Sequence, residues 1–148
     1  MPSPELAGIS KNKTKPSPSP KNLKTNKFSI LVIEDNPDNL VSLKAILGEK
    51  YNILEAIDGK QGLQMTLDIL PDLVLLDVML PKINGIEVIK RIRADKKAKE
   101  IPVLALTART MIGDREKILA AGCNDYLSKP IEVDIIRQKL DEWLGQKV

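Results

Sequence analysis

The sequence contains no histidine among its 148 residues, and it has a single cysteine, Cys123. One cysteine cannot form an intramolecular disulfide, so we expect a reducing compartment, and a zinc site is not expected without histidines or a cysteine cluster. The absence of histidine also removes the commonest general base. The chain also cannot carry a phosphohistidine of its own.

Aromatic residues make up only 3% of the chain, and no apolar run is longer than four residues. The short runs predict neither a membrane span nor a secretory signal, so we expect a soluble, cytoplasmic protein. A core with so few aromatic side chains must be built from Leu, Ile, Val and Ala. This composition favours layers of helix and sheet in one domain of ordinary size.

Acidic residues are scarce in the first 27 residues, where Glu5 stands against six lysines, five prolines and four serines. This composition predicts a disordered basic arm over residues 1–27, followed by a folded domain over residues 28–148. The arm is interpreted as a solvated leader, with docking to an acidic partner or surface as the alternative. Removing the arm's charges from the 23 basic and 20 acidic residues leaves a net charge of −2, which gives no nucleic-acid footprint.

Short apolar runs alternate with helical patterns from Phe28 onward. The runs predict five strands, at Ile30–Ile33, Asn52–Ala56, Leu73–Leu76, Val103–Leu106 and Asp125–Leu127. The helices are expected to begin near Pro37, after Asp58 and after Gly85, to stop near Gly122, and to span Ile135 to Leu144. Uninterrupted apolar strands joined by helices predict a doubly wound α/β fold with a five-stranded parallel sheet.

Polar residues recur where the predicted strands end. Glu34 and Asp35 follow the first strand, Asp77 follows the third, Thr107 the fourth and Lys129 the fifth. Because the carboxyl ends of parallel strands lie at one edge of the sheet, where such folds bind ligands, we expect these side chains to meet in one crevice.

Three carboxylates within about 5 Å repel one another by roughly 3 kcal/mol per pair at an effective dielectric constant near 20. A hard divalent cation offsets this repulsion, and an all-oxygen site without histidine or thiolate favours Mg2+. The alternative is that Glu34 and Asp35 only cap the helix near Pro37, but capping accounts for neither Asp77 nor Lys129.

Asp77 is the best candidate for a nucleophile, because a carboxylate can form an aspartyl phosphate and this one stands at the tip of the most apolar strand. In such a transfer Lys129 would pair with one phosphoryl oxygen, and the Thr107 hydroxyl would donate a hydrogen bond to another.

Four segments carry a resemblance to a known family. They are Ile30-Leu-Val-Ile-Glu34-Asp35, Leu75-Leu76-Asp77-Val-Met-Leu-Pro81 with Gly85, Leu106-Thr107-Ala108 and Tyr126-Leu-Ser-Lys129-Pro130. In this order they resemble response-regulator receiver domains, the family that includes the chemotaxis regulator CheY, over about residues 28–146. The stretch from Thr107 to Cys123 is also similar to single-domain regulators of the DivK kind and to receivers of hybrid kinases, and it suggests that Cys123 is a packed, unreactive residue.

The resemblance implies the flavodoxin or CheY-like strand order 2-1-3-4-5. It also implies that Asp77 is phosphorylated, that Glu34, Asp35, Asp77 and the backbone carbonyl of Met79 bind Mg2+, and that Lys129 contacts the phosphoryl group. The Lys129–Pro130 peptide bond would be cis.

Thr107 and Tyr126 correspond to the family's switch pair. On phosphorylation the threonine moves toward the phosphate and the tyrosine ring turns inward. This change remodels the surface of the fourth helix, fifth strand and fifth helix, where a partner binds.

The resemblance thus implies a phosphoacceptor switch of a two-component or phosphorelay system, and not an enzyme with a separate substrate. A histidine kinase or histidine phosphotransfer protein would donate the phosphoryl group. The phosphorylated chain would bind a downstream target protein or pass the phosphate to a phosphotransfer protein, and the sequence does not separate these roles. We expect a monomer or a weak, phosphorylation-dependent dimer without an output domain.

Two other classes fit less well. A phosphatase of the haloacid dehalogenase type needs a second aspartate two residues after its nucleophile, where this chain has Met79, and it needs room for a cap domain. A DNA-binding transcription factor would need an output domain, for which residues 28–148 leave no room. The basic arm leaves weak nucleic-acid binding open.

Overall fold

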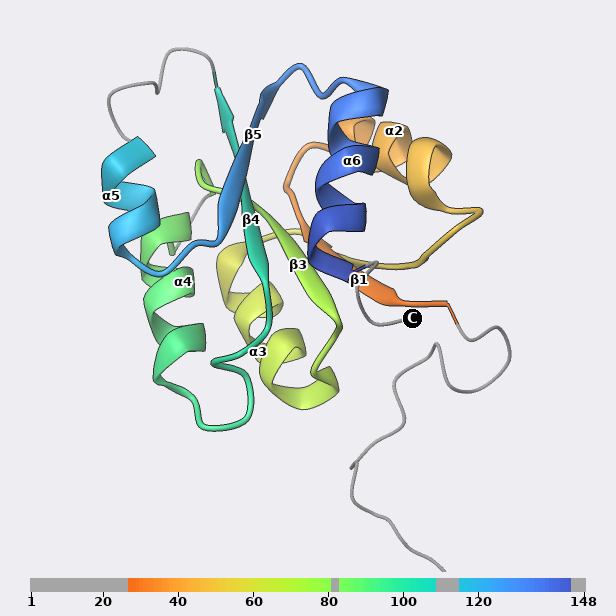
Figure 1. The fold of residues 1–148 in the computed structure, drawn as a ribbon. Coiled ribbons are helices and arrows are strands. Elements are labelled where there is room, and N and C mark those ends of the chain that lie inside the picture. Colours follow the sequence, from red (N-terminus) through yellow and green to blue (C-terminus); the bar gives the residue numbers. More distant parts are fainter. Residues whose placement is uncertain (1–26, 81–82, 109–114, 145–148) are drawn as a thin grey trace, which may run out of the picture.

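A computed structural model describes residues 27–80, 83–108 and 115–144. Five strands form one parallel sheet in the order β2-β1-β3-β4-β5, which confirms the predicted fold class and strand order (Figure 1). The strands are β1 (Ser29–Ile33), β2 (Asn52–Ala56), β3 (Leu73–Asp77), β4 (Val103–Ala108) and β5 (Asp125–Lys129). Except for Lys27, the predicted basic arm lies outside the described residues.

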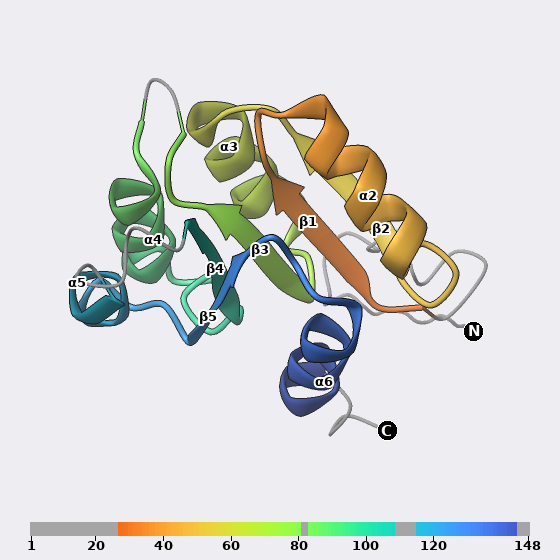
Figure 2. The ribbon, with the colours of Figure 1, turned by 90° about the horizontal axis from the view of Figure 1, so that it is seen from above.

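Within the described ranges, five helices cover the two faces of the sheet (Figure 2). They are α2 (Pro37–Leu47), α3 (Gly59–Ile69), α4 (Gly85–Ala94), α5 (Arg115–Ala120) and α6 (Val133–Leu144). Helices α3, α4 and α5 pack on one face, and α2 and α6 pack on the other. None of the helices within the described ranges has the length and apolar character needed to cross a bilayer.

Alternate strand residues supply two separate cores. Leu31 and Ile33 point toward α3, α4 and α5, whereas Ile30 and Val32 point toward α2 and α6. All four are fully buried. Burial on both faces explains why these strands are continuously apolar, and each such side chain contributes roughly 2 kcal/mol through removal from water.

The helix boundaries follow the predicted signals. The Asn36 side chain caps α2 by accepting from the backbone N–H of Asp38 at 2.8 Å, and Pro37 follows in the first turn. After α5, Gly122 adopts a φ of +117°, which confirms it as the glycine that ends the helix. Strands β3, β4 and β5 extend further than predicted. Asp77 and Lys129 are therefore the last residues of β3 and β5, and Thr107 is the next-to-last residue of β4, whereas all three were expected just beyond their strands.

Helix α3 packs differently from the face suggested by its leucines. Gly62 and Thr66 are fully buried, while Leu63 and Leu67 are only half-buried beside the core. A Cβ atom on Gly62 would lie 2.4 Å from Cδ1 of Ile33, so the missing side chain lets α3 approach the sheet closely. The Thr66 hydroxyl is satisfied within the helix by donating to the Gly62 carbonyl at 2.7 Å.

Candidate functional site

The predicted polar residues meet at the carboxyl edge of the sheet. One carboxylate oxygen from each of Glu34, Asp35 and Asp77 lies within 4.8 Å of the other two. Glu34 and Asp77 are buried, with 1% and 4% of their surfaces exposed, whereas Asp35 is exposed. The cluster therefore has a buried floor and one open side, where a ligand can enter.

Lys129 bridges two of these carboxylates from the end of β5. Its Nζ atom lies 2.9 Å from Oδ2 of Asp77 and 3.0 Å from Oε1 of Glu34. The contact with Asp77 is a hydrogen bond, whereas Glu34 Oε1 is buried and has no hydrogen-bond partner. The ion pair with Glu34 thus lacks hydrogen-bond geometry, and this oxygen retains unused capacity as an acceptor.

Burial shifts the titration of both members of this pair. It raises the pKa of Glu34, and the neighbouring Asp77 carboxyl group raises that pKa further, against a smaller opposing effect of Lys129. Burial alone would lower the pKa of Lys129, but its hydrogen bond with Asp77 and its charge interactions with Asp77 and Glu34 raise it overall. The cleft therefore favours the charged form of Lys129 and disfavours the charged form of Glu34.

Capping of α2 does not explain these carboxylates. Asn36 is the capping residue, and Glu34 only accepts a longer 3.3 Å hydrogen bond from the Asn36 backbone through its other oxygen, Oε2. If Glu34 and Asp35 only capped α2, the contact between Glu34 and Lys129 would have no explanation.

Asp77 is held in one orientation from two sides. Its Oδ1 accepts a hydrogen bond from the backbone N–H of Met79 at 2.8 Å, and its Oδ2 accepts from Lys129. The Met79 side chain itself is 65% exposed, so only the backbone of this residue takes part in the cleft. The predicted cis bond between Lys129 and Pro130 is present.

The two residues of the predicted switch pair lie on β4 and β5, and Thr107 directly follows Leu106, the residue of β4 that pairs with Asp77. Thr107 is buried, and its hydroxyl donates to the Leu127 carbonyl at 3.4 Å, which is a long contact. The half-buried ring of Tyr126 lies under the guanidinium of Arg115, whose Cζ is 4.7 Å from the ring centroid. We had not identified Arg115 from the sequence, because a single arginine at the start of a helix carries no local signal of this contact.

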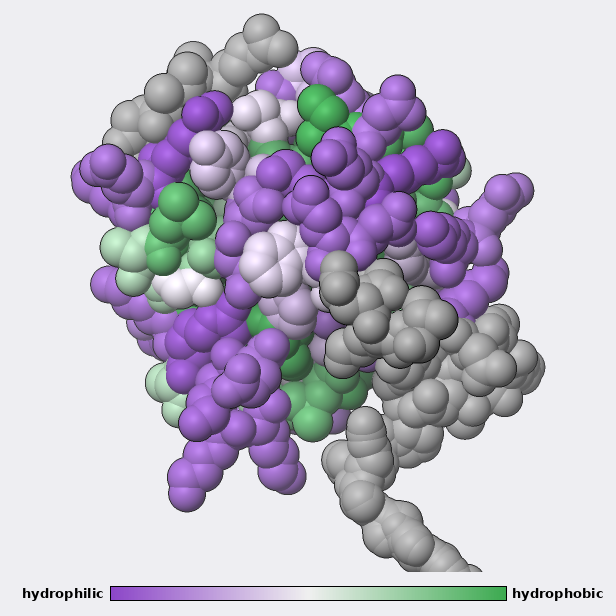
Figure 3. Space-filling view, viewed as in Figure 1, coloured by the Kyte–Doolittle hydropathy of each residue, from purple (hydrophilic) through white to green (hydrophobic). Residues whose placement is uncertain are grey.

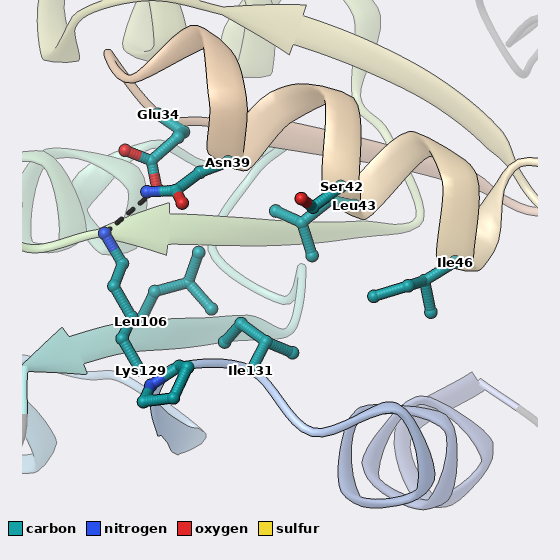
Figure 4. A pocket seen from close by; sticks show the side chains of 9 residues that line it. Glu34, Asn39, Ser42, Leu43, Ile46, Leu106, Lys129 and Ile131 are labelled. Carbon is teal, nitrogen blue, oxygen red and sulfur yellow. Dashed lines mark ion pairs between the residues drawn. The ribbon is translucent and has the colours of Figure 1, made fainter.

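A cavity of about 180 Å3 opens beside the cleft, between α2 and the segment after β5. Figure 4 shows that Asn39, Ser42 and Ile46 approach it from α2, while Lys129 and Ile131 line the opposite side. The Lys129 side chain extends along the cavity toward Glu34. Lys129 was predicted as a site residue, but Asn39, Ser42, Ile46 and Ile131 were not, because their contacts form only when α2 and the segment after β5 come together.

The donor set of the cleft suits a hard metal cation. All three candidate ligands are carboxylates, and the buried Glu34 oxygen without a hydrogen bond is a ready acceptor for a cation. The side chain of Cys123 is buried, and burial raises the pKa of its thiol. Cys123 is thus a packed residue, as predicted, and an oxygen-ligand site is the chemistry that this cleft supports.

The chain is a doubly wound α/β protein with an acidic cleft and a lysine at the end of a strand. Comparisons with known proteins identify the family. The chain matches the response regulator receiver domain over residues 30–141. The polar-differentiation response regulator DivK of Brucella ovis is 35% identical over 118 residues, which cover 79% of this chain and 96% of DivK.

Solved structures agree with this match. The receiver domain of the sensor histidine kinase PA1611 from Pseudomonas aeruginosa, which has a magnesium ion coordinated in its active site cleft, is 36% identical with a TM-score of 0.75. The alignment covers 80% of this chain and 98% of that one. A co-crystal of the Saccharomyces cerevisiae histidine phosphotransfer protein Ypd1 with the receiver domain of its downstream response regulator Ssk1 contains a chain that is 30% identical, with a TM-score of 0.74 and coverage of 82% and 91%.

The chain belongs to the response regulator receiver domain family. It is accordingly a receiver of two-component and phosphorelay signalling, and its fold is the CheY-like arrangement that the sequence predicted. Membership in this family sets aside the alternative of a haloacid dehalogenase phosphatase.

Proposed function

We propose that Asp77 is the phosphoacceptor of this receiver and that it takes its phosphoryl group from a phosphohistidine on a partner protein. The observation that supports this most directly is the contact between Lys129 Nζ and Asp77 Oδ2 at 2.9 Å, in a cleft with two further carboxylates. The carboxylate is thus oriented, and a cation stands where negative charge would increase during transfer.

The transfer forms one bond and breaks one. An Asp77 oxygen bonds to phosphorus while the bond between phosphorus and the donor imidazole breaks, and the electron pair leaves with the imidazole nitrogen, which takes a proton from solvent. The backbone N–H of Met79 donates to Oδ1 of Asp77 and so holds the oxygen that does not bond to phosphorus. Lys129 then exchanges its contact with the carboxylate for one with a phosphoryl oxygen.

Mg2+ is the proposed cofactor, held by Glu34, Asp35, Asp77 and the backbone carbonyl of Met79. When bound it offsets the negative charge of the phosphoryl oxygens and of the clustered carboxylates. The bound magnesium of the PA1611 receiver domain supports the choice of metal. Because its environment raises the pKa of Glu34, a bound cation would favour the ionised form of this carboxyl group.

Thr107 and Tyr126 are the proposed switch. The Thr107 hydroxyl would leave its 3.4 Å contact with Leu127 to donate to the phosphoryl group, and the Tyr126 ring would turn inward. The altered surface would comprise α5, β5 and α6. Figure 3 shows that this face is mainly hydrophilic, with apolar residues in separate small groups, so a downstream target protein would recognise it largely through polar contacts.

The phosphodonor would be a histidine kinase or a histidine phosphotransfer protein. The complex of Ypd1 with the Ssk1 receiver supports a partner of this kind. The cavity beside the cleft offers such a partner apolar surface from Ile46 and Ile131 within reach of Lys129. We further propose that the protein is cytoplasmic and that it does not turn over a separate substrate. It would be either a monomer or a weak dimer that forms on phosphorylation.

Incubation with phosphoramidate and Mg2+, followed by intact mass measurement, tests this function. We expect one added phosphoryl group, which is lost when Mg2+ is omitted. An unmodified chain at saturating donor and metal would contradict the proposal. Mixing the phosphorylated protein with a histidine phosphotransfer protein then separates the two roles, because transfer of the label to that partner indicates a relay.

A further inference from the structure

Arg115 connects the start of α5 to the tyrosine of β5. It is the first residue of the helix, and its guanidinium carbon lies 4.7 Å from the centroid of the Tyr126 ring. A guanidinium within about 6 Å of a ring centroid is attracted to the ring face. Helix α5 and strand β5 lie next to each other in Figure 1, so the contact joins two neighbouring elements of the proposed switch surface.

One polar atom of Arg115 has no hydrogen-bond partner in the described part of the chain while the guanidinium lies over the ring. Its Nε atom is buried and has no hydrogen-bond partner among the described residues. A buried N–H without a partner costs free energy, so the ring contact must offset that cost while Arg115 stays in this position. A contact that carries such a cost suits an element that exchanges between two arrangements.

Tyr126 lies beside a small residue of the neighbouring strand, on the same face of the sheet as Thr107. Ala105 is the residue of β4 directly paired with Tyr126, and Thr107 follows two positions later on the same face of the sheet. Ala105 presents only a methyl group next to Tyr126, so no large side chain of this β4 residue stands between the ring and Thr107. The 3.4 Å contact of the Thr107 hydroxyl with Leu127 is long, so little opposes the displacement of the threonine.

We propose that Arg115 is a positioning residue that holds the Tyr126 ring beneath α5 and thereby restrains the switch. This inference rests on the proposed function, because it concerns the ring movement that accompanies phosphorylation of Asp77. Binding of a phosphoryl group must break the Arg115 contact to move the ring. By thermodynamic reciprocity, weakening the contact tightens the binding of a phosphoryl mimic.

The test uses Arg115→Gln, which removes the cation but keeps a planar, hydrogen-bonding group on a shorter side chain. Lys117→Gln is the matched control, because it removes the same charge from the same short helix. Each is combined with Tyr126→Leu, which deletes the ring. The chain has only two tyrosines, so labelling with 3-fluorotyrosine gives two fluorine resonances, and Tyr51→Phe assigns them.

The measurement is a titration with beryllium fluoride, which mimics a phosphoryl group on a carboxylate, in the presence of Mg2+. The Tyr126 fluorine resonance reports the environment of the ring in the variants that retain Tyr126. Calorimetry gives the affinity for beryllium fluoride in all variants. We expect Arg115→Gln to shift the Tyr126 resonance before any mimic is added and to tighten binding about two- to tenfold. We expect Lys117→Gln to do neither, and Arg115→Gln to leave the affinity unchanged in the Tyr126→Leu background.

Two results would overturn the inference. Unchanged affinity in Arg115→Gln would show that the contact does not restrain the switch, and an equal change with and without the Tyr126 ring would show that the arginine acts through its charge alone. If the wild-type protein binds no beryllium fluoride, the proposed function itself fails, and the role of Arg115 in the switch fails with it. Wild-type binding with no effect of Arg115→Gln refutes the Arg115 inference alone.

Discussion

The ammonium of Lys129 lies 2.9 Å from Oδ2 of Asp77, and this ion pair joins the last residues of β5 and β3. The two residues are 52 positions apart in sequence and are brought together by strand order, with β4 between their strands. The lysine offsets the carboxylate charge in this state, and it is placed to offset phosphoryl charge after transfer.

Replacement of Lys129 tests that role. We expect Lys129→Met to lower the rate of phosphorylation by phosphoramidate about 100-fold or more, since removal of one stabilising group from a reacting centre commonly has this effect. Lys44→Met is the control, because Lys44 forms a 2.8 Å ion pair with Glu55 outside the acidic cleft. The rate is measured by intact mass at limiting donor. Equal rates in Lys129→Met and Lys44→Met would show that Lys129 has no part in the transfer.

Metal binding is expected to depend on Asp35. The exposed position of this carboxylate makes it the ligand through which a cation would enter, and we expect Asp35→Asn to weaken Mg2+ binding at least about tenfold. Asp38→Asn is the matched control, since Asp38 is also exposed but lies outside the carboxylate cluster. Calorimetric titration with Mg2+ measures both. Similar affinities in the two variants would place the metal elsewhere.

The pH dependence of metal binding follows from Glu34. Ordinary carboxylates titrate near about pH 4. The pKa of Glu34 is raised by burial and by Asp77, so at this residue a proton competes with Mg2+ at pH values above that range. As pH falls from neutral, we expect Mg2+ affinity to decrease before ordinary carboxylates titrate, with release of a proton on binding in that range. Glu34→Gln should flatten this dependence as well as weaken binding. Calorimetry in buffers of different ionisation enthalpy detects the proton, and its absence would contradict this reasoning.

Much of this site could be predicted because the fold gathers strand ends. Glu34, Asp77 and Lys129 each follow or end an apolar run, so recognition of the runs was enough to place the side chains at one edge of a parallel sheet. The cis bond before Pro130 was predicted only through the family resemblance, since local sequence favours the trans form.

Other features depend on contacts that no local pattern records. Leucine spacing predicted α3 but not its burial through Gly62, which follows from the position of Ile33 on a different element. The same holds for Arg115, whose position over Tyr126 is set by the placement of α5 beside β5. Apolar periodicity indicates which helices and strands form. Contacts between side chains of different elements depend on how closely those elements pack against one another.

The most direct test of the central claim locates the phosphoryl group. An aspartyl phosphate is an acyl phosphate, and borohydride reduces it to homoserine, which peptide mass mapping can place on one residue. After phosphorylation with phosphoramidate and Mg2+, we predict homoserine at position 77 and nowhere else, with none formed in Asp77→Asn. Homoserine at Asp35 or another carboxylate, or a phosphoryl group on a hydroxyl that resists reduction, would contradict the account.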